Sequence, residues 1–140
     1  MTISIDSNII VALWQRNDPA SSTAASTLEQ ARRRGALVVS GPVYAELMGD
    51  PNRTETGLDD FLGDTGILID WTLDELVWRE AGRAYRGYTQ RRRSSGGDPP
   101  RHILTDFLIG AQAVVRSYTL LTFDQRLYAA AFPALDMMWN

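Results

Sequence analysis

Apolar and polar positions alternate along the chain with two different periods, which predicts strands separated by helices. Ile3 and Ile5 alternate with polar neighbours, as in a short strand, and the next apolar residues follow helical spacing from Ile9 to Trp14. The same change of period recurs toward the C-terminus and predicts further strands over 37–39, 67–69, 118–121 and 135–138. This alternation indicates an α/β fold with a mainly parallel sheet.

Capping and turn residues mark the ends of the intervening helices. Asp18 before Pro19 is typical of a helix start, and Gly35 ends that helix. Pro42 lies in the first turn of the next helix, which Gly49 terminates. Further helices are expected over 57–63, 73–92, 103–115 and around 127–128, and the clear loop is 94–100.

Length and composition indicate one globular domain over residues 1–140, because the chain has 140 residues of which 44% are apolar. The absence of cysteine excludes disulfides, thiolate metal sites and cysteine nucleophiles. All 14 basic residues are arginine, which also excludes lysine-dependent mechanisms. No segment has the pattern of a signal peptide or a membrane span, so we expect a cytoplasmic protein without membrane contact.

Four acidic residues differ from the others in their surroundings. Asp6 and Asp124 directly follow apolar strands, where parallel sheets place their ligand crevice. Asp106 lies within a strongly apolar helix, and Glu46 lies among apolar residues of another. Taken singly, each has an ordinary explanation, as an N-cap, a first-turn acid that compensates the helix dipole, or an arginine partner.

Taken together, the four acids indicate a metal site. Convergent carboxylates repel one another unless a cation neutralises them, and a ligand set of oxygens alone suits Mg²⁺ or Mn²⁺. A natural substrate for such a site is a phosphodiester, because the metal can activate water and stabilise the leaving oxygen. With one histidine and no cysteine, the chain has few other means of hydrolysis.

The order of four short motifs resembles that of PIN-domain nucleases, and the resemblance runs from Ile3 to about Trp139. The motifs are Asp6-Ser7-Asn8, the stretch Pro42 to Leu47 with Glu46, the stretch Asp106 to Ala111, and Leu121-Thr122-Phe123-Asp124. Each is weak alone, and their order and spacing make the resemblance specific. Gly110, where alanine is common, and the loop 95–101, which is longer and richer in Gly and Pro than usual, are the two departures.

The resemblance implies a three-layer α/β/α fold with strand order 3-2-1-4-5 and a metal-dependent endoribonuclease. Because the chain is short and has no long insertions, it is most similar to the VapC toxins of toxin–antitoxin pairs. This similarity implies a homodimer that is inhibited by a VapB-like antitoxin. It further implies Asp6, Asp106 and Asp124 as ligands of Mg²⁺ or Mn²⁺, with Glu46 binding through water or orienting the attacking water. Hydroxyl or amide groups of Ser7, Asn8 and Thr122 would hold these carboxylates in place; for Ser7 and Thr122, helix capping alone is an equal alternative.

Two arginine runs, Arg32 to Arg34 and Arg91, Arg92 and Arg93, end predicted helices, where positive charge complements the helix dipole. That ordinary explanation is preferred for both. The second run adjoins the loop before Asp106, which leads to the hypothesis that it guides RNA phosphates toward the site. His102, the single histidine, is assigned no role.

Other protein classes remain open at this stage. An aspartyl-phosphate enzyme or a receiver domain would also place acids at strand ends, but both rely on a lysine that this chain lacks. A PIN-domain RNA-processing nuclease without a toxin role is a closer alternative. A non-enzymatic α/β interaction module is another, and it differs from the nuclease in binding no metal.

Overall fold

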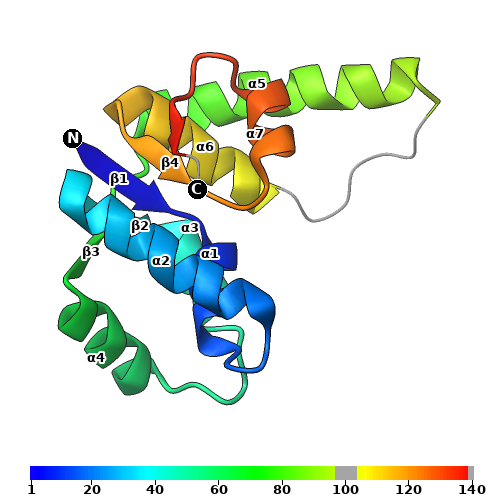
Figure 1. Ribbon diagram of the computed structural model, residues 1–140. Coiled ribbons are helices and arrows are strands. Elements are labelled where there is room, and N and C mark those ends of the chain that lie inside the picture. Colours follow the sequence, from blue (N-terminus) through cyan, green and yellow to red (C-terminus); the bar gives the residue numbers. More distant parts are fainter. Residues whose placement is uncertain (97–103, 139–140) are drawn as a thin grey trace.

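A five-stranded parallel sheet forms the centre of the molecule. The computed structural model describes residues 1–96 and 104–138 (Figure 1). The strands are β1 (Thr2–Ile5), β2 (Ala36–Ser40), β3 (Ile67–Asp70), β4 (Thr119–Leu121) and β5 (Met137–Met138). Their order is β3-β2-β1-β4-β5 and every pairing is parallel, which confirms the predicted topology.

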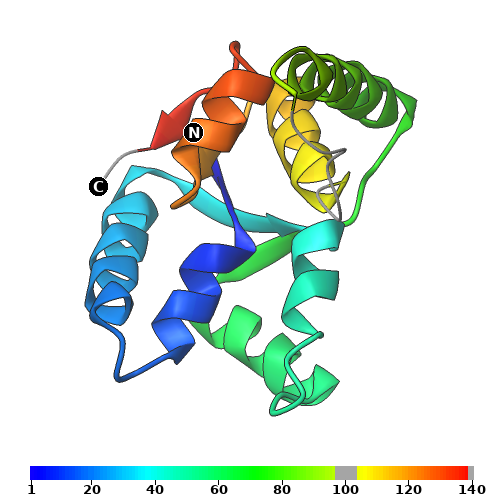
Figure 2. The same ribbon diagram turned by 90° about the vertical axis from the view of Figure 1, so that its right-hand side faces the viewer.

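Helices cover both faces of this sheet. They are α1 (Ser7–Trp14), α2 (Pro19–Arg34), α3 (Gly41–Leu47), α4 (Glu55–Thr65), α5 (Glu75–Ser94), α6 (Leu104–Arg116) and α7 (Gln125–Ala131). Figure 2 shows α1, α2 and α4 on one side of the sheet and α5, α6 and α7 on the other. The predicted three-layer arrangement is therefore confirmed.

Helix starts follow the capping residues closely. Asp18 accepts a hydrogen bond from the amide of Ala20, as its place before Pro19 predicts. Two helices differ from the expected bounds because Thr54 caps α4 at Glu55 and Asp74 caps α5 at Glu75. The last strand is shorter than expected, since it contains only Met137–Met138.

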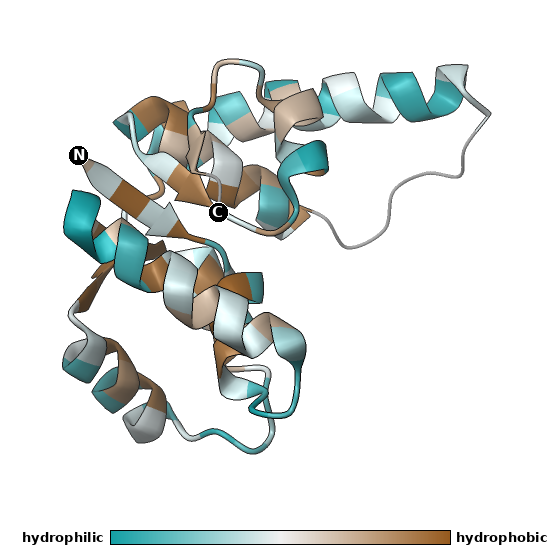
Figure 3. Ribbon diagram, viewed as in Figure 1, coloured by the Kyte–Doolittle hydropathy of each residue, from teal (hydrophilic) through white to brown (hydrophobic). Residues whose placement is uncertain are grey.

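The core lies between the sheet and the flanking helices. Ile3, Ile5 and Val39 are fully buried on the strands. Seven consecutive residues of α6, from Phe107 to Ala113, are also buried, which makes α6 the most enclosed helix. The outer end of α5, in contrast, projects past the other helices and is hydrophilic (Figure 3).

Among the described residues, no helix is both long and apolar enough to cross a membrane. His102, Trp139 and residues 97–100 of the expected loop lie outside the described residues.

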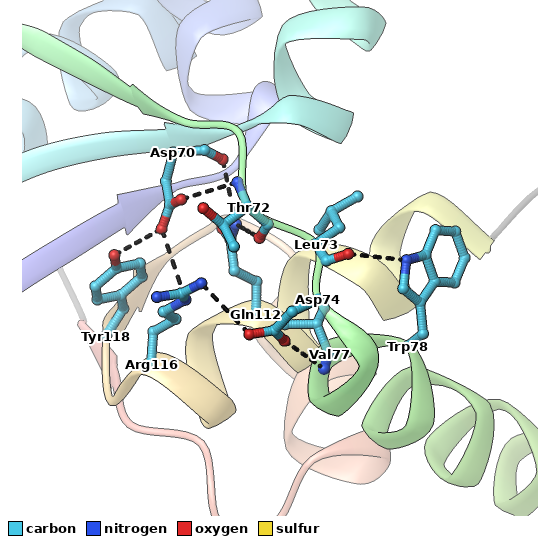
Figure 4. A network of polar contacts seen from close by, with 9 residues as sticks. All are labelled: Asp70, Thr72, Leu73, Asp74, Val77, Trp78, Gln112, Arg116 and Tyr118. Atoms are coloured by element: carbon cyan, nitrogen blue, oxygen red, sulfur yellow. Dashed lines mark hydrogen bonds and ion pairs between the residues drawn. The ribbon is translucent and has the colours of Figure 1, made fainter.

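A polar network fixes the end of α6 to the connection between β3 and α5 (Figure 4). The buried Gln112 side chain donates to the backbone carbonyls of Asp70 and Thr72, at 3.2 and 2.9 Å. Tyr118 donates a 2.7 Å hydrogen bond to the Asp70 carboxylate. Burial raises the pKa of Asp70, but hydrogen bonds and the charge of Arg116 outweigh it and lower the pKa overall. Asp70 is therefore a charged structural anchor for the C-terminal part of α6.

Candidate functional site

The site begins where β1 and β4 end side by side. The backbone amide of Asp6, one residue past β1, donates a 2.9 Å hydrogen bond to the carbonyl of Leu121, the last residue of β4. The chain order reverses between these two strands, since β2 lies on one side of β1 and β4 on the other. Such a switch point is where open parallel sheets place their ligand crevice.

Asp6 is held by two donors at this point. The side chain is 3% exposed. One carboxylate oxygen, Oδ1, accepts a 2.8 Å hydrogen bond from the amide of Ser7, and Oδ2 accepts one of 2.7 Å from the Thr122 hydroxyl. Both carboxylate oxygens therefore have a defined orientation before any ligand binds.

Asn8 joins the first and last motifs of the site. Its amide nitrogen donates to the Thr122 hydroxyl oxygen at 3.3 Å, and its amide oxygen accepts from the backbone of Phe123 at 3.2 Å. The Thr122 hydroxyl oxygen also accepts from the amide of Asp124 at 3.0 Å. Asn8 and Thr122 thus form one connected network behind the Asp6 carboxylate.

Three carboxylates converge in front of this network. One oxygen from each of Asp6, Glu46 and Asp106 lies within 4.8 Å of the others. Glu46 also accepts a 3.3 Å hydrogen bond from the Ser7 hydroxyl. The explanation of Glu46 as a first-turn acid is wrong, because it lies near the end of α3 and the first turn of that helix contains no acid. The sheet and the helices thus bring acids together that are 100 residues apart along the chain.

Burial and mutual repulsion make these acids hold protons more tightly than usual. Burial, together with the charges of Asp6 and Asp106, raises the pKa of Glu46 to about 7. Burial also raises the pKa of Asp106 to about 6, with the charges of Asp6 and Asp124 adding to the effect. The pKa of Asp6 is raised chiefly by burial, although its hydrogen bonds oppose the shift. Near neutral pH the cluster therefore retains protons that a cation would displace.

Asp124 occupies a different place from the other three acids. It is the N-cap residue of α7 but makes no side-chain capping bond, so capping does not account for its carboxylate. It is not among the three residues whose oxygens converge within 4.8 Å. Its charge nonetheless contributes to the raised pKa values of Asp6 and Asp106. The charge of Asp124 therefore acts on Asp6 and Asp106, although Asp124 is not part of the group of three.

Tyr128 is a residue of the site that the sequence analysis did not identify. It is 1% exposed, and its hydroxyl donates a 3.4 Å hydrogen bond to Oδ1 of Asp106. Burial and the charges of Asp6 and Asp106 strongly raise the pKa of Tyr128, so it remains a neutral donor. Its position four residues after Asp124 was the available signal, because both then lie on one face of a helix.

Arg91, Arg92 and Arg93 are not brought to the acidic cluster. They lie in the last turn of α5, at the outer end of the projecting helix (Figure 1). Among the described contacts, none joins them to the four acids. Arg91 instead lines an open surface hollow with Gly87, Gln90, Ser94 and Ser95.

The donor set fits a hard divalent cation. No described ion pair includes Asp6, Glu46 or Asp106, so no arginine in the described part of the chain neutralises them by direct contact. Isolated buried charge is costly, and carboxylate oxygens are the ligands that Mg²⁺ and Mn²⁺ prefer. The cluster thus has the composition and the unbalanced charge of a metal site.

The chain belongs to the PIN domain family, since the family model matches residues 3–133. The motifs that suggested this resemblance are the same ones that the fold brings to the carboxyl edge of β1 and β4. No curated protein sequence matches the chain.

Solved structures with this fold cover almost the whole chain. A chain of VapBC2 from Rickettsia felis, bound to a promoter DNA fragment, is 19% identical with a TM-score of 0.63 and full coverage of both chains. A chain of VapBC-1 from nontypeable Haemophilus influenzae is 16% identical with a TM-score of 0.69, covering 99% of this chain and 97% of that one. A chain of FitAcB from Neisseria gonorrhoeae is 19% identical with a TM-score of 0.57, covering 98% and 96%. At these identities the similarity establishes the fold.

Proposed function

We propose that this protein is an Mg²⁺- or Mn²⁺-dependent endoribonuclease that acts as the toxin of a toxin–antitoxin pair. The observation that carries the proposal is the convergence of Asp6, Glu46 and Asp106 within 4.8 Å, at the edge of a PIN fold and without a cationic partner among the described residues. PIN domains are generally nucleases, so an acidic cluster in this position that could hold a divalent cation supports phosphodiester hydrolysis.

Each residue of the site has a distinct role in this proposal. A divalent cation held by Asp6, Asp106 and Asp124 would lower the pKa of a water and stabilise the charge that develops on the phosphodiester. Glu46, half-buried and with a pKa raised to about 7, is placed to orient the attacking water and accept its proton. Ser7, Asn8 and Thr122 keep Asp6 and Glu46 in their binding orientation.

The toxin role and its antitoxin are supported by the structures that share this fold. Their chains come from VapBC and FitAB assemblies. Each match covers at least 93% of this chain and at least 93% of the chain it is compared with. We infer that a VapB-like antitoxin binds this protein and that RNA is its substrate.

The homodimer that the family resemblance implies is supported by exposed apolar side chains. Leu68 and Trp71, at and just past the edge strand β3, are 65% and 62% exposed, and Leu76 and Trp78 at the start of α5 are 62% and 49% exposed. Large apolar residues exposed in this number are typical of protein interfaces. Light scattering of the purified protein tests this point, with a monomeric mass as the contrary result.

The test of the nuclease is metal-dependent cleavage of RNA. Purified protein is incubated with structured RNA in Mg²⁺, Mn²⁺ or EDTA, and Asp6→Asn is purified in parallel so that a contaminating ribonuclease is detected. We expect cleavage that requires both the metal and Asp6. A melting temperature that added metal leaves unchanged, together with no cleavage, would instead identify a non-enzymatic interaction module.

The test of the toxin role is growth after induced expression. Wild-type protein should arrest growth, and Asp6→Asn should not. Cleavage in vitro without growth arrest would favour the RNA-processing nuclease.

A further inference from the structure

We propose that Tyr128 is a positioning residue of this site, whose hydroxyl holds the Asp106 carboxylate in its metal-binding orientation. The proposal rests on the metal-dependent function above and adds a residue that the four acids and their predicted supporting groups do not include. It is carried by the hydroxyl-to-carboxylate contact and by the way α7 packs against α6.

The Tyr128 hydroxyl is a polar group placed deep in an apolar region. The side chain is among the largest that are fully buried, and its ring belongs to the hydrophobic core. A phenylalanine would fill the same space without the cost of burying a hydroxyl. The hydroxyl is compensated where it meets the acids, by its 3.4 Å hydrogen bond to Asp106 Oδ1.

Two residue pairs, one helical turn apart, form this contact between α6 and the segment from Tyr128 to Phe132 at the end of α7. Asp106 and Gly110 share one face of α6, because they are four residues apart. Tyr128 and Phe132 are likewise four apart, and the amide of Phe132 donates a 2.8 Å hydrogen bond to the Tyr128 carbonyl, which preserves the helical spacing. Asp106 thus meets Tyr128 at one turn, and Gly110 meets Phe132 at the next.

The second pair sets the distance at which the first pair meets. A Cβ added at Gly110 would lie 2.3 Å from Cε2 of Phe132, so the aromatic ring occupies the space that any other side chain would need. The glycine therefore makes room for the Phe132 ring, which lies directly after α7, and this packing holds the end of α7 where the Tyr128 hydroxyl reaches the Asp106 carboxylate. Gly110, a departure from the family pattern at the sequence level, has here a specific packing role.

A donor fixed in this way supplies what a carboxylate ligand needs. With both Tyr128 and Phe132 buried, the hydroxyl cannot follow Asp106 into other rotamers. Outer hydrogen bonds of this kind orient metal ligands, and their loss typically weakens metal binding about 10- to 100-fold. Asp6 receives the same support from Thr122, so Tyr128 does for Asp106 what Thr122 does for Asp6.

The experiment measures Mn²⁺ binding by titration calorimetry to wild type, Tyr128→Phe and Tyr118→Phe. Tyr118 is the matched control, because its hydroxyl also donates to a carboxylate, that of Asp70, away from the acidic cluster. We expect Tyr128→Phe to weaken Mn²⁺ binding about 10-fold or more and Tyr118→Phe to change it less than about twofold. Equal affinity of Tyr128→Phe and wild type overturns the proposal.

RNA cleavage as a function of Mn²⁺ concentration separates positioning from a general structural effect. We expect Tyr128→Phe to need more Mn²⁺ and to recover most of the wild-type rate at saturation. A reduced rate that extra Mn²⁺ does not restore overturns the positioning role.

Gly110→Ala provides a second variant, because it keeps the hydroxyl but displaces α7, and it should also weaken Mn²⁺ binding. If folded Gly110→Ala binds Mn²⁺ as tightly as wild type, the contact between Gly110 and Phe132 does not control the contact between Asp106 and Tyr128. If wild type binds no Mn²⁺, the proposed function fails with this proposal, whereas binding by wild type and Tyr128→Phe alike overturns only the role of Tyr128.

Discussion

The hydroxyl of Thr122 donates a 2.7 Å hydrogen bond to the carboxylate of Asp6, although the two residues are 116 positions apart in the chain. Both follow strands directly, and those strands, β1 and β4, are neighbours in the sheet. Thr122 also accepts hydrogen bonds from Asn8 and from the amide of Asp124. One hydroxyl therefore connects both ends of the site.

Replacement of Thr122 by valine should reduce both stability and metal binding. The hydroxyl is buried and is one of the donors to the nearly buried Asp6 carboxylate. Loss of a hydrogen bond to a buried charged group costs about 1–3 kcal/mol, and metal affinity should fall about 10- to 100-fold. Denaturant unfolding and Mn²⁺ calorimetry measure the two effects. Thr122→Ser keeps the hydroxyl and should resemble wild type; a valine variant that behaves the same way would contradict this role.

The stability of the metal-free protein should fall as the pH rises from about 4.5 to about 7.5. Glu46 and Asp106 have pKa values of about 7 and about 6 when folded, above their ordinary values of 4.5 and 3.8. In this window the folded state binds more protons than the unfolded state, so the free energy of unfolding decreases with increasing pH. Thermal melts in EDTA across the range measure the change.

Glu46→Gln is the matched control for this pH dependence. It removes a carboxyl group whose pKa is raised to about 7 and should make the decrease shallower. Saturating Mg²⁺ should also oppose the decrease, because it binds the deprotonated carboxylates. If the free energy of unfolding falls as steeply with pH in Glu46→Gln as in wild type, groups other than Glu46 cause the pH dependence.

Gly110→Ala should destabilise the protein even though alanine favours helices. In an open helical position this change stabilises by up to about 1 kcal/mol. Here the added Cβ would lie 2.3 Å from the ring of Phe132, and such overpacking costs about 1–3 kcal/mol. Gly82 in α5 is the control, because an added Cβ meets nothing within 4 Å there, so Gly82→Ala should stabilise. Denaturant unfolding of both variants checks the opposite signs.

Asp124→Asn should weaken Mn²⁺ binding less than Asp106→Asn does. Asp106 belongs to the group of three oxygens within 4.8 Å, whereas Asp124 acts on that group through its charge. Calorimetric titration of both variants compares them directly. Equal losses would contradict this ranking of the proposed ligands and show that Asp124 contributes as much to cation binding as Asp106 does.

Changing Arg91, Arg92 and Arg93 together to alanine should weaken RNA binding and leave the fold intact. The three residues crowd the last turn of the projecting helix α5, and phosphate contacts by arginine also make affinity dependent on salt. Binding of a catalytically inactive Asp6→Asn protein to RNA at several salt concentrations measures the effect. Arg32, Arg33 and Arg34 form the control run, where Arg32 and Arg33 pair with Glu29. RNA affinity unaffected by the Arg91 to Arg93 changes would remove these residues from the binding surface.

The sequence alone determined the fold class and most of the acidic site. The alternation of apolar residues depends on neighbours only a few positions apart, and so does the helix cap Asp18-Pro19. Both can therefore be recognised from the sequence without a structure. The same holds for Asp6, because an acid directly after an apolar strand is a local pattern that fixes its place at the sheet edge.

The tertiary structure decided which groups meet. It placed Glu46 with Asp6 and Asp106, left Asp124 outside the group of three, and put Arg91 to Arg93 at the far end of a helix. It also revealed that the Tyr128 hydroxyl contacts Asp106 and that Gly110 leaves room for the ring of Phe132. Such contacts depend on the packing distance between helices, and a distance set by side chains far apart in the chain leaves no periodic signal in the sequence.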